Sequence, residues 1–178
     1  MSKPAQMYDH ELNPVKGWPS PYAVDKSADM VLGEDEVAYR GQVASLNSNA
    51  KFQLGLECAA MPIFLLNTSK DYDVVGDDYN LVGNGTGVPR MSGVVAIGGY
   101  EVESTEYDEA SVYAPNDALT AGAPGAADAG VLQPGELYAD TICGVVSDGT
   151  AMNEFKRNVL RFWPVWLPPL ECPAESSN

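Results

Sequence analysis

The stretch VAYRGQVASL, Val37 to Leu46, decides the fold class, because its residues alternate between two faces. Successive side chains of a β-strand point to opposite sides of a sheet. One face carries Val37, Tyr39, Gly41, Val43 and Ser45, and the other Ala38, Arg40, Gln42, Ala44 and Leu46. The first face is moderately apolar, which predicts a half-buried strand.

Short segments of the same kind recur along the chain. KFQLGL (51–56) and AAMPIFLLN (59–67) are bounded by Asn, Ser, Gly and Asp, as strands often are. In SGVVAIGGYEVEST (92–105), one face carries Tyr100, Val102 and Ser104 and the other Glu101, Glu103 and Thr105. This alternation predicts a strand with one dry face and one charged face.

The last two expected strands are ADTICGVVSDG (139–149) and NVLRFWPVWLPP (158–169), joined by TAMNEF (150–155) as one helical turn. No segment of a dozen residues has convincing helical periodicity. We therefore predict an all-β fold, a single β-sandwich or barrel-like domain with long loops. At 178 residues the chain fits one domain, which buries roughly 70% of its unfolded surface.

Composition divides the chain into three parts. Residues 1–35 carry four prolines, which favour an extended, irregular arm: Pro4, Pro14, Pro19 and Pro21. Residues 36–172 form the β domain, and residues 173–178 form a C-terminal tail. Within the domain, Leu119 to Leu132 is rich in Ala, Gly, Pro and Asp, which predicts a surface loop with little structure of its own.

The charge limits the partners. A formal net charge of -15 and a pI near 4.1 argue against nucleic acid, which is bound largely through Lys and Arg. They also argue against an anionic membrane surface. We expect neither partner, and we expect the acidic side chains to form solvated faces.

The three cysteines, Cys58, Cys143 and Cys172, have no C-x-x-C spacing and are odd in number. They suggest neither a disulfide framework nor a zinc site. The N-terminal MSKPAQMYDHELNP has no apolar leader region, and the longest apolar run, CAAMPIFLL, is too short to span a bilayer. We therefore expect synthesis in a reducing cytoplasm, and we take the N-x-S/T matches at Asn67 and Asn84 for chance.

No motif predicts an enzyme, a cofactor or a metal site. His10 is the only histidine and lies in the Pro-rich arm, which disfavours a Ser-His-Asp or Cys-His site. LVGNGTGVPR (81–90) lacks the spacing of a phosphate-binding loop. Asp71, Asp73 and Gly76 resemble a calcium loop, but Val75 and Val82 stand where oxygen ligands belong.

LRFWPVWLPP, Leu160 to Pro169, is apolar on both faces. Either it is buried inside one domain, or its faces divide between the core and a partner. In the second case Leu160, Phe162 and Trp166 join the core, whereas Trp163 and Leu167 lie in a protein interface. Pro164 favours an edge position because it cannot donate a ladder hydrogen bond. In the arm, Trp18, Pro19 and Tyr22 are candidate anchors to a neighbouring subunit.

The succession VYAPNDALTAG, VLQPGELYADTICGVVSDG and LRFWPVWLPP resembles the small β-rich structural proteins of tailed bacteriophage particles, especially head decoration or cement proteins. RGQVASLNSNAKFQLG is similar to their opening strand and turn. The resemblance covers residues 37 to 169. It implies a non-enzymatic virion protein that binds the major capsid protein on the capsid exterior, associates with itself on the capsid lattice and stabilises the shell.

The acidic charge agrees with an outer position, because packaged DNA repels it. Two alternatives stay open. A tail tube or head-to-tail joining subunit has the same composition. A carbohydrate-binding module, with or without calcium, needs Trp18, Trp163 and Tyr100 exposed together as a sugar platform.

Overall fold

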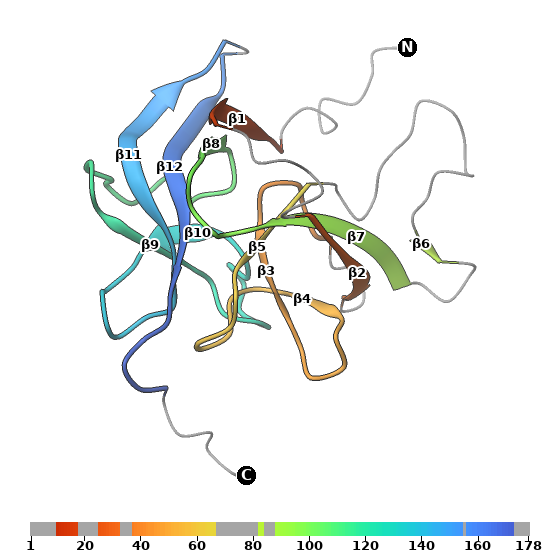
Figure 1. Cartoon of the computed structure of the whole chain (residues 1–178). Helices are drawn as coiled ribbons and strands as arrows, with labels where there is room; N and C mark the ends of the chain where they lie inside the picture. The colour runs from red at the N-terminus through yellow and green to blue at the C-terminus, as the bar shows by residue number, and fades with distance from the viewer. Residues whose placement is uncertain are drawn as a thin grey trace, which may run out of the picture.

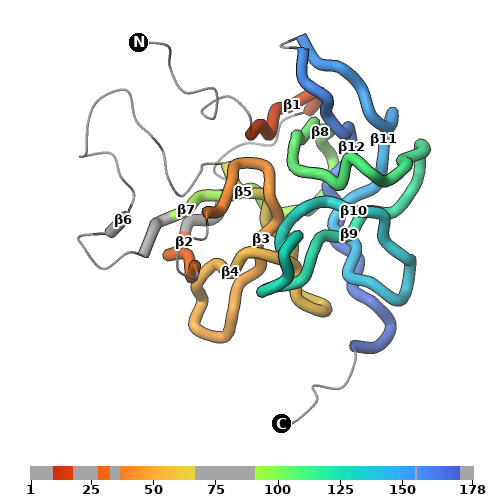
Figure 2. The backbone as a smooth tube through the Cα atoms, turned by 180° about the vertical axis from the view of Figure 1, so that it is seen from behind, coloured from red at the N-terminus to blue at the C-terminus, as the bar shows by residue number. Residues whose placement is uncertain are grey.

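The computed structural model describes residues 10–17, 25–32, 37–66, 82–83, 88–154 and 156–172. Throughout these ranges the chain is all-β: it forms strands, turns and loops and contains no helix. The strands form two six-stranded sheets that lie side by side (Figure 1 and Figure 2). The all-β part of the predicted fold is therefore confirmed.

The first sheet is antiparallel and is built around the long β11–β12 hairpin at its centre. Its order is β1 (Leu12–Lys16), β8 (Glu101–Ser104), β12 (Asn158–Leu167), β11 (Ile142–Met152), β9 (Ala118–Ala121) and β10 (Leu132–Pro134). The hairpin strands have 11 and 10 residues, as their long apolar runs predict. Figure 1 shows the two strands running side by side.

The second sheet closes on itself. Its order is β2 (Asp25–Val31), β4 (Phe52–Leu54), β3 (Val43–Leu46), β5 (Ile63–Leu65), β7 (Val88–Val95) and β6 (Val82–Gly83). Because β2 also pairs with β7, five of these strands form a barrel, and β6 extends β7 outside it. Closure gives every barrel strand two neighbours, which removes exposed edges.

Two buried clusters hold the fold together. One fills the barrel with Met30, Phe52, Ile63, Leu65 and Met91. The other joins the barrel to the first sheet, where Phe64 of β5 meets Phe162 of β12 with ring centroids 5.2 Å apart. The two sheets therefore share this second cluster, while the first belongs to the barrel alone.

Residues 1–35 contain two strands of the fold, where the prolines predict an irregular arm. β1 pairs with β8, and β2 pairs with β4 and β7. Leu12 is 1% exposed and lies in the shared core, and Pro14 is tolerated because β1 is an edge strand. Residues 1–9, 18–24 and 33–36 lie outside the described part of the chain.

The Ala/Gly-rich region from Leu119 to Leu132 joins β9 to β10 and is exposed in its middle, as a surface loop would be, but both of its ends are packed against the barrel, which the prediction did not include. The Val43 amide donates to the Gly130 carbonyl at 2.8 Å, and the Leu56 amide donates to the Gly122 carbonyl at 3.0 Å. A Cβ atom at Gly130 would lie 2.5 Å from the Val43 carbonyl oxygen. The small residues therefore permit close contact between backbones.

The hairpin turn also differs from its prediction. Thr150, Ala151 and Met152 extend β11 rather than begin a helical turn. Asn153 then closes the turn, since its amide donates to the Arg157 carbonyl at 2.9 Å and its side-chain oxygen accepts from the Arg157 amide at 3.0 Å. These two bonds replace the helical turn that TAMNEF predicts.

Candidate interaction surface

β12 changes from core to surface along its length. Leu160 and Phe162 are completely buried, as predicted. Trp163 is 45% exposed and Leu167 is 44% exposed, which is the exposure that an interface role requires. Trp166 is 37% exposed, so its predicted place in the core is wrong.

The side chains of β12 become exposed where the neighbouring strand β8 ends. β8 pairs with β12 from Leu160 to Phe162, and beyond Phe162 only an isolated bridge from Ile97 to Val165 continues on that side. Pro164, paired with Gly144 of β11, falls just after this point. The predicted edge position therefore applies only to the C-terminal half of the strand.

The chain after β12 adds further exposed apolar side chains. We define the C-terminal patch as the exposed apolar side chains of the last part of β12, of the segment after it and of Tyr138, which is hydrogen-bonded to that segment: Trp163, Trp166, Leu167, Leu170 and Tyr138. The Leu170 amide donates to the Tyr138 carbonyl at 3.0 Å, which ties the end of the chain to the segment before β11. Leu170 and Tyr138 are 78% and 69% exposed.

A disulfide fixes the same segment. Cys58, in the turn between β4 and β5, is bonded to Cys172 with a Cα–Cα distance of 5.7 Å. The expectation that the cysteines form no disulfide is therefore wrong. The two cysteines of this disulfide are 114 residues apart in sequence. Cysteine spacing alone does not reveal that the fold brings them together.

The neighbourhood of Cys58 is also hydrogen-bonded to the first sheet. The Ala59 amide donates to the Thr141 hydroxyl oxygen at 2.7 Å, and that hydroxyl donates to the Glu57 carbonyl at 3.3 Å. The backbone that carries the C-terminal patch is therefore fixed by a disulfide and by hydrogen bonds. A preorganised surface of this kind loses little conformational entropy when it binds.

The third cysteine has a different environment. Cys143 is fully buried as a free thiol, and burial raises its pKa well above the ordinary range. A protonated, inaccessible thiol is a poor nucleophile. Cys143 therefore acts as a small core residue.

The charged face predicted for residues 100–105 carries ion pairs. Arg161 Nε lies 3.2 Å from Glu103 Oε2, and Lys16 Nζ lies 3.8 Å from Glu101 Oε2. Glu103 and Glu101 are 8% and 3% exposed, so this face is largely covered. Buried carboxylates need such partners, which gives these residues a structural role.

His10 is likewise part of a structural contact. Its Nδ1 lies 2.6 Å from Glu106 Oε1, and its ring stacks on Tyr39 with centroids 3.7 Å apart. Glu106 also accepts a hydrogen bond from the Thr105 hydroxyl at 3.0 Å. These contacts join the start of β1 to the loop after β8.

Several other predicted positions fall outside the described residues. They are the arm anchors Trp18, Pro19 and Tyr22, the glycosylation matches Asn67 and Asn84, the acidic segment Asp71 to Asp78, and Gly85 and Gly87. Over the described ranges, no three His, Cys, Asp or Glu side chains gather where they would hold a metal ion. The same residues include no helix suited to crossing a bilayer.

The predicted sugar platform is not formed by Tyr100. This residue is 3% exposed, and its hydroxyl donates to the Val95 carbonyl at 2.8 Å. Trp163 therefore has no exposed partner at position 100. A carbohydrate-binding module of the kind outlined from the sequence loses one of its three aromatic residues.

Tyr138, Leu170 and the Cys58–Cys172 disulfide were not predicted from the sequence. The signal for Leu170 is present in PLEC (169–172), an apolar residue after a proline pair in a segment that does not continue the strand. Tyr138 gives no such signal, because only the fold brings it beside Leu170. The chain matches no protein-family model, and no curated protein or solved structure is detectably similar to it.

Proposed function

We propose that the protein is a non-enzymatic virion structural protein that binds the outer surface of a phage head and stabilises it. The observation that carries the proposal is the C-terminal patch. Trp163, Trp166 and Leu170 stand exposed on a segment held by strand pairing and by the disulfide. Exposed tryptophans on a rigid support are typical of protein interfaces.

The disulfide supports an exterior position. Disulfides persist in oxidising surroundings, which include the surfaces of virus particles, and are rare in a reducing cytoplasm. Cys58 and Cys172 are both exposed, so they are accessible to the surrounding redox environment. A chain made in the cytoplasm would complete this bond on a particle released from the cell.

The charge supports the same position. The formal net charge of -15 would be repelled by packaged DNA, whereas an outer surface imposes no such cost. The resemblance of residues 37–169 to decoration proteins is the reason for proposing the major capsid protein as the partner. Binding only the assembled shell stabilises it by mass action.

The test is co-sedimentation of the purified protein with expanded phage heads stripped of accessory proteins. Unexpanded shells serve as the control, because a decoration site is complete only on the mature lattice. We expect saturable binding to expanded heads. Ring or tube formation without binding to either shell would instead assign the protein to the tail or the head-to-tail joint.

A further inference from the structure

The chain from Pro168 to Cys172 continues past the end of β12 and belongs to neither sheet. Pro169 is partly exposed, and the other four residues of this segment are exposed. Burial of apolar surface therefore contributes little to holding the segment in place. Figure 1 shows it in dark blue, curving away below the strands.

Within the described residues, this segment has one hydrogen bond and one covalent bond to the rest of the protein. The Leu170 amide donates to the Tyr138 carbonyl at 3.0 Å, and Cys172 is bonded to Cys58. A single hydrogen bond between exposed residues competes with water and holds a chain weakly. The disulfide is therefore the bond that keeps Leu170 beside Tyr138.

The residues on either side of the disulfide are fixed without it. On one side, the Ala59 amide donates to the Thr141 hydroxyl oxygen at 2.7 Å. On the other, β12 stays paired with β11 as far as Leu167, which lies opposite Ile142. Loss of the disulfide would therefore release the stretch after Leu167 and leave both sheets intact.

Tyr138 is also fixed independently of the disulfide. The Glu136 amide donates to the Asp140 carboxylate at 2.8 Å, and the Asp140 amide donates to the Glu136 carbonyl at 2.9 Å. Between them Tyr138 has a left-handed backbone, with φ of 73°. Such a conformation is uncommon for a bulky residue and persists where its surroundings impose it. Tyr138 would therefore keep its position when Leu170 is released.

The disulfide is accessible to reagents in solution. Cys58 and Cys172 are both exposed, whereas the third cysteine of the chain, Cys143, is completely buried. Thiol–disulfide exchange requires that an attacking thiolate reach one of the two sulfur atoms. In the folded protein, exchange is therefore confined to the Cys58–Cys172 pair.

We propose that the Cys58–Cys172 disulfide is a redox-sensitive switch that completes the C-terminal patch. In the oxidised protein Leu170 lies beside Tyr138, and in the reduced protein residues 168–172 are released and Leu170 leaves the patch. The inference deepens the proposed function and rests on it for its consequence. The protein would bind the shell weakly in a reducing cytoplasm and tightly on a released particle.

The chemistry of the switch is thiol–disulfide exchange. To close it, the two thiols give up two protons and two electrons and form one S–S bond. A small-molecule disulfide such as oxidised glutathione accepts them and is released as two thiols, through a mixed disulfide with one of the cysteines. A dithiol such as dithiothreitol reverses the reaction and is itself oxidised to a cyclic disulfide.

The test compares the ¹⁵N-labelled full-length protein before and after treatment with dithiothreitol, by backbone NMR relaxation. We expect the order parameter of the Leu170 amide to be about 0.85 in the oxidised protein and below about 0.6 in the reduced protein. Tyr138 should keep its value. The same order parameter for Leu170 in both forms would overturn the proposal, and so would loss of the folded spectrum on reduction.

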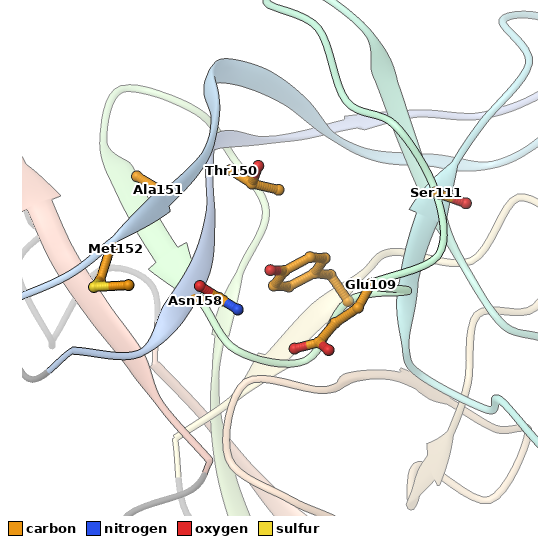
Figure 3. Close-up of a pocket in the computed structure, with 7 residues that line it drawn as sticks. Glu109, Ser111, Thr150, Ala151, Met152 and Asn158 are labelled. Carbon is orange, nitrogen blue, oxygen red and sulfur yellow. The ribbon is translucent and has the colours of Figure 1, made fainter.

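The turn end of the β11–β12 hairpin is the internal control, because it lies at the opposite end of the hairpin from Leu167. Tyr107, Thr150 and Asn158 are among the residues that line a hollow of about 410 Å³ there (Figure 3). The amides of these three residues should have the same shifts and order parameters in both forms. Changes there as large as those at Leu170 would contradict a local switch.

Two variants separate the effect of the bond from that of the reagent. Cys58→Ser/Cys172→Ser should have a mobile Leu170 without dithiothreitol and should not respond to it. Cys143→Ala keeps the disulfide and is the matched control, so it should respond as the unaltered protein does. A rigid Leu170 in the double variant would overturn the proposal.

Co-sedimentation with stripped, expanded phage heads separates the switch from the proposed function. We expect the oxidised protein to bind at least about tenfold more tightly than Cys58→Ser/Cys172→Ser. If neither binds, the proposed function fails while the switch stands on the NMR result. If both bind equally although Leu170 is mobile in the variant, the function stands and redox control of binding is contradicted.

Discussion

Phe64 of β5 and Phe162 of β12 meet with ring centroids 5.2 Å apart and rings tilted by 42°, at the junction of the barrel and the first sheet. Phe64 is 1% exposed and Phe162 is completely buried. Aromatic pairs in this arrangement add to the free energy gained from burial. This contact is one of those through which the two sheets fold as one unit.

Phe162→Ala is therefore expected to lower the free energy of unfolding by about 3–5 kcal/mol, because it leaves a cavity in the shared core. The neighbouring Trp163→Ala, at a residue 45% exposed, should cost about 1 kcal/mol or less. Urea denaturation of both variants measures the difference. Equal losses would mean that Trp163 belongs to the core and not to an interface.

Gly130 and Gly125 offer a matched test of the packed Ala/Gly region. Both have left-handed backbones, with φ of 75° and 77°. A Cβ at Gly130 would lie 2.5 Å from the Val43 carbonyl, whereas a Cβ at Gly125 meets nothing within 4 Å. Both alanine variants carry a backbone penalty of about 1–2 kcal/mol, and Gly130→Ala should lose roughly 1–3 kcal/mol more.

Thermal and urea unfolding would measure these losses. Similar stabilities for Gly130→Ala and Gly125→Ala would show that the region is a loose surface loop after all. A larger loss at Gly130 would show that close backbone contact explains its composition.

Removal of the disulfide should lower the free energy of unfolding, because the unfolded chain then gains conformational entropy. The bond joins residues 114 positions apart, and closing a loop of that size is worth about 2–5 kcal/mol. Cys172→Ser and Cys58→Ser should each cause this loss, and the double variant should lose no more than either. Losses that add in the double variant would indicate separate roles for the two cysteines.

Alkaline pH should weaken the fold through Tyr113. Burial, and then the charge of Asp108, raise the pKa of Tyr113 to about 12 from a usual value of 10.0. The unfolded chain therefore loses this proton at lower pH than the folded chain does. The contribution of Tyr113 to the free energy of unfolding is fully present below pH 10 and falls as the pH rises from about 10 to 12.

Tyr113→Phe should flatten that decline in free energy of unfolding, measured by urea denaturation at a series of pH values. At neutral pH the variant is expected to be about 1 kcal/mol less stable, because it lacks the bond to the Asp108 carbonyl. A decline with pH as steep as that of the unaltered protein would assign the effect to other groups.

Local alternation and apolar runs predicted β8, β11 and β12 in the second half, but neither β9 nor β10. The 92–105 pattern placed Tyr100, Val102 and Ser104 on the buried side, and all three are buried. Leu160 and Phe162 were placed correctly for the same reason. The opposite face of β8 is buried as well, since Glu101 and Glu103 are covered and ion-paired, so the two-residue period assigned the faces but not their burial.

Such local patterns do not predict contacts between segments that are distant in sequence. Leu12 and Met30 lie in a region whose prolines suggested an arm, yet strand pairing with distant segments buries both. The Cys58–Cys172 bond and the exposure of Trp166 likewise depend on which strands end where. Tyr107 gave no signal of a hollow, because its neighbours Thr150 and Asn158 come from the distant hairpin.

We propose that the C-terminal patch binds the shell of a phage head. The most direct test compares the double variant Trp166→Ala/Leu170→Ser with Val112→Ser in co-sedimentation with stripped, expanded heads. Val112 is 87% exposed, but it lies on the loop after β8 rather than in the patch. We predict that the double variant stays folded and loses at least tenfold in affinity, while Val112→Ser binds normally. Unchanged binding by the folded double variant would contradict the claim.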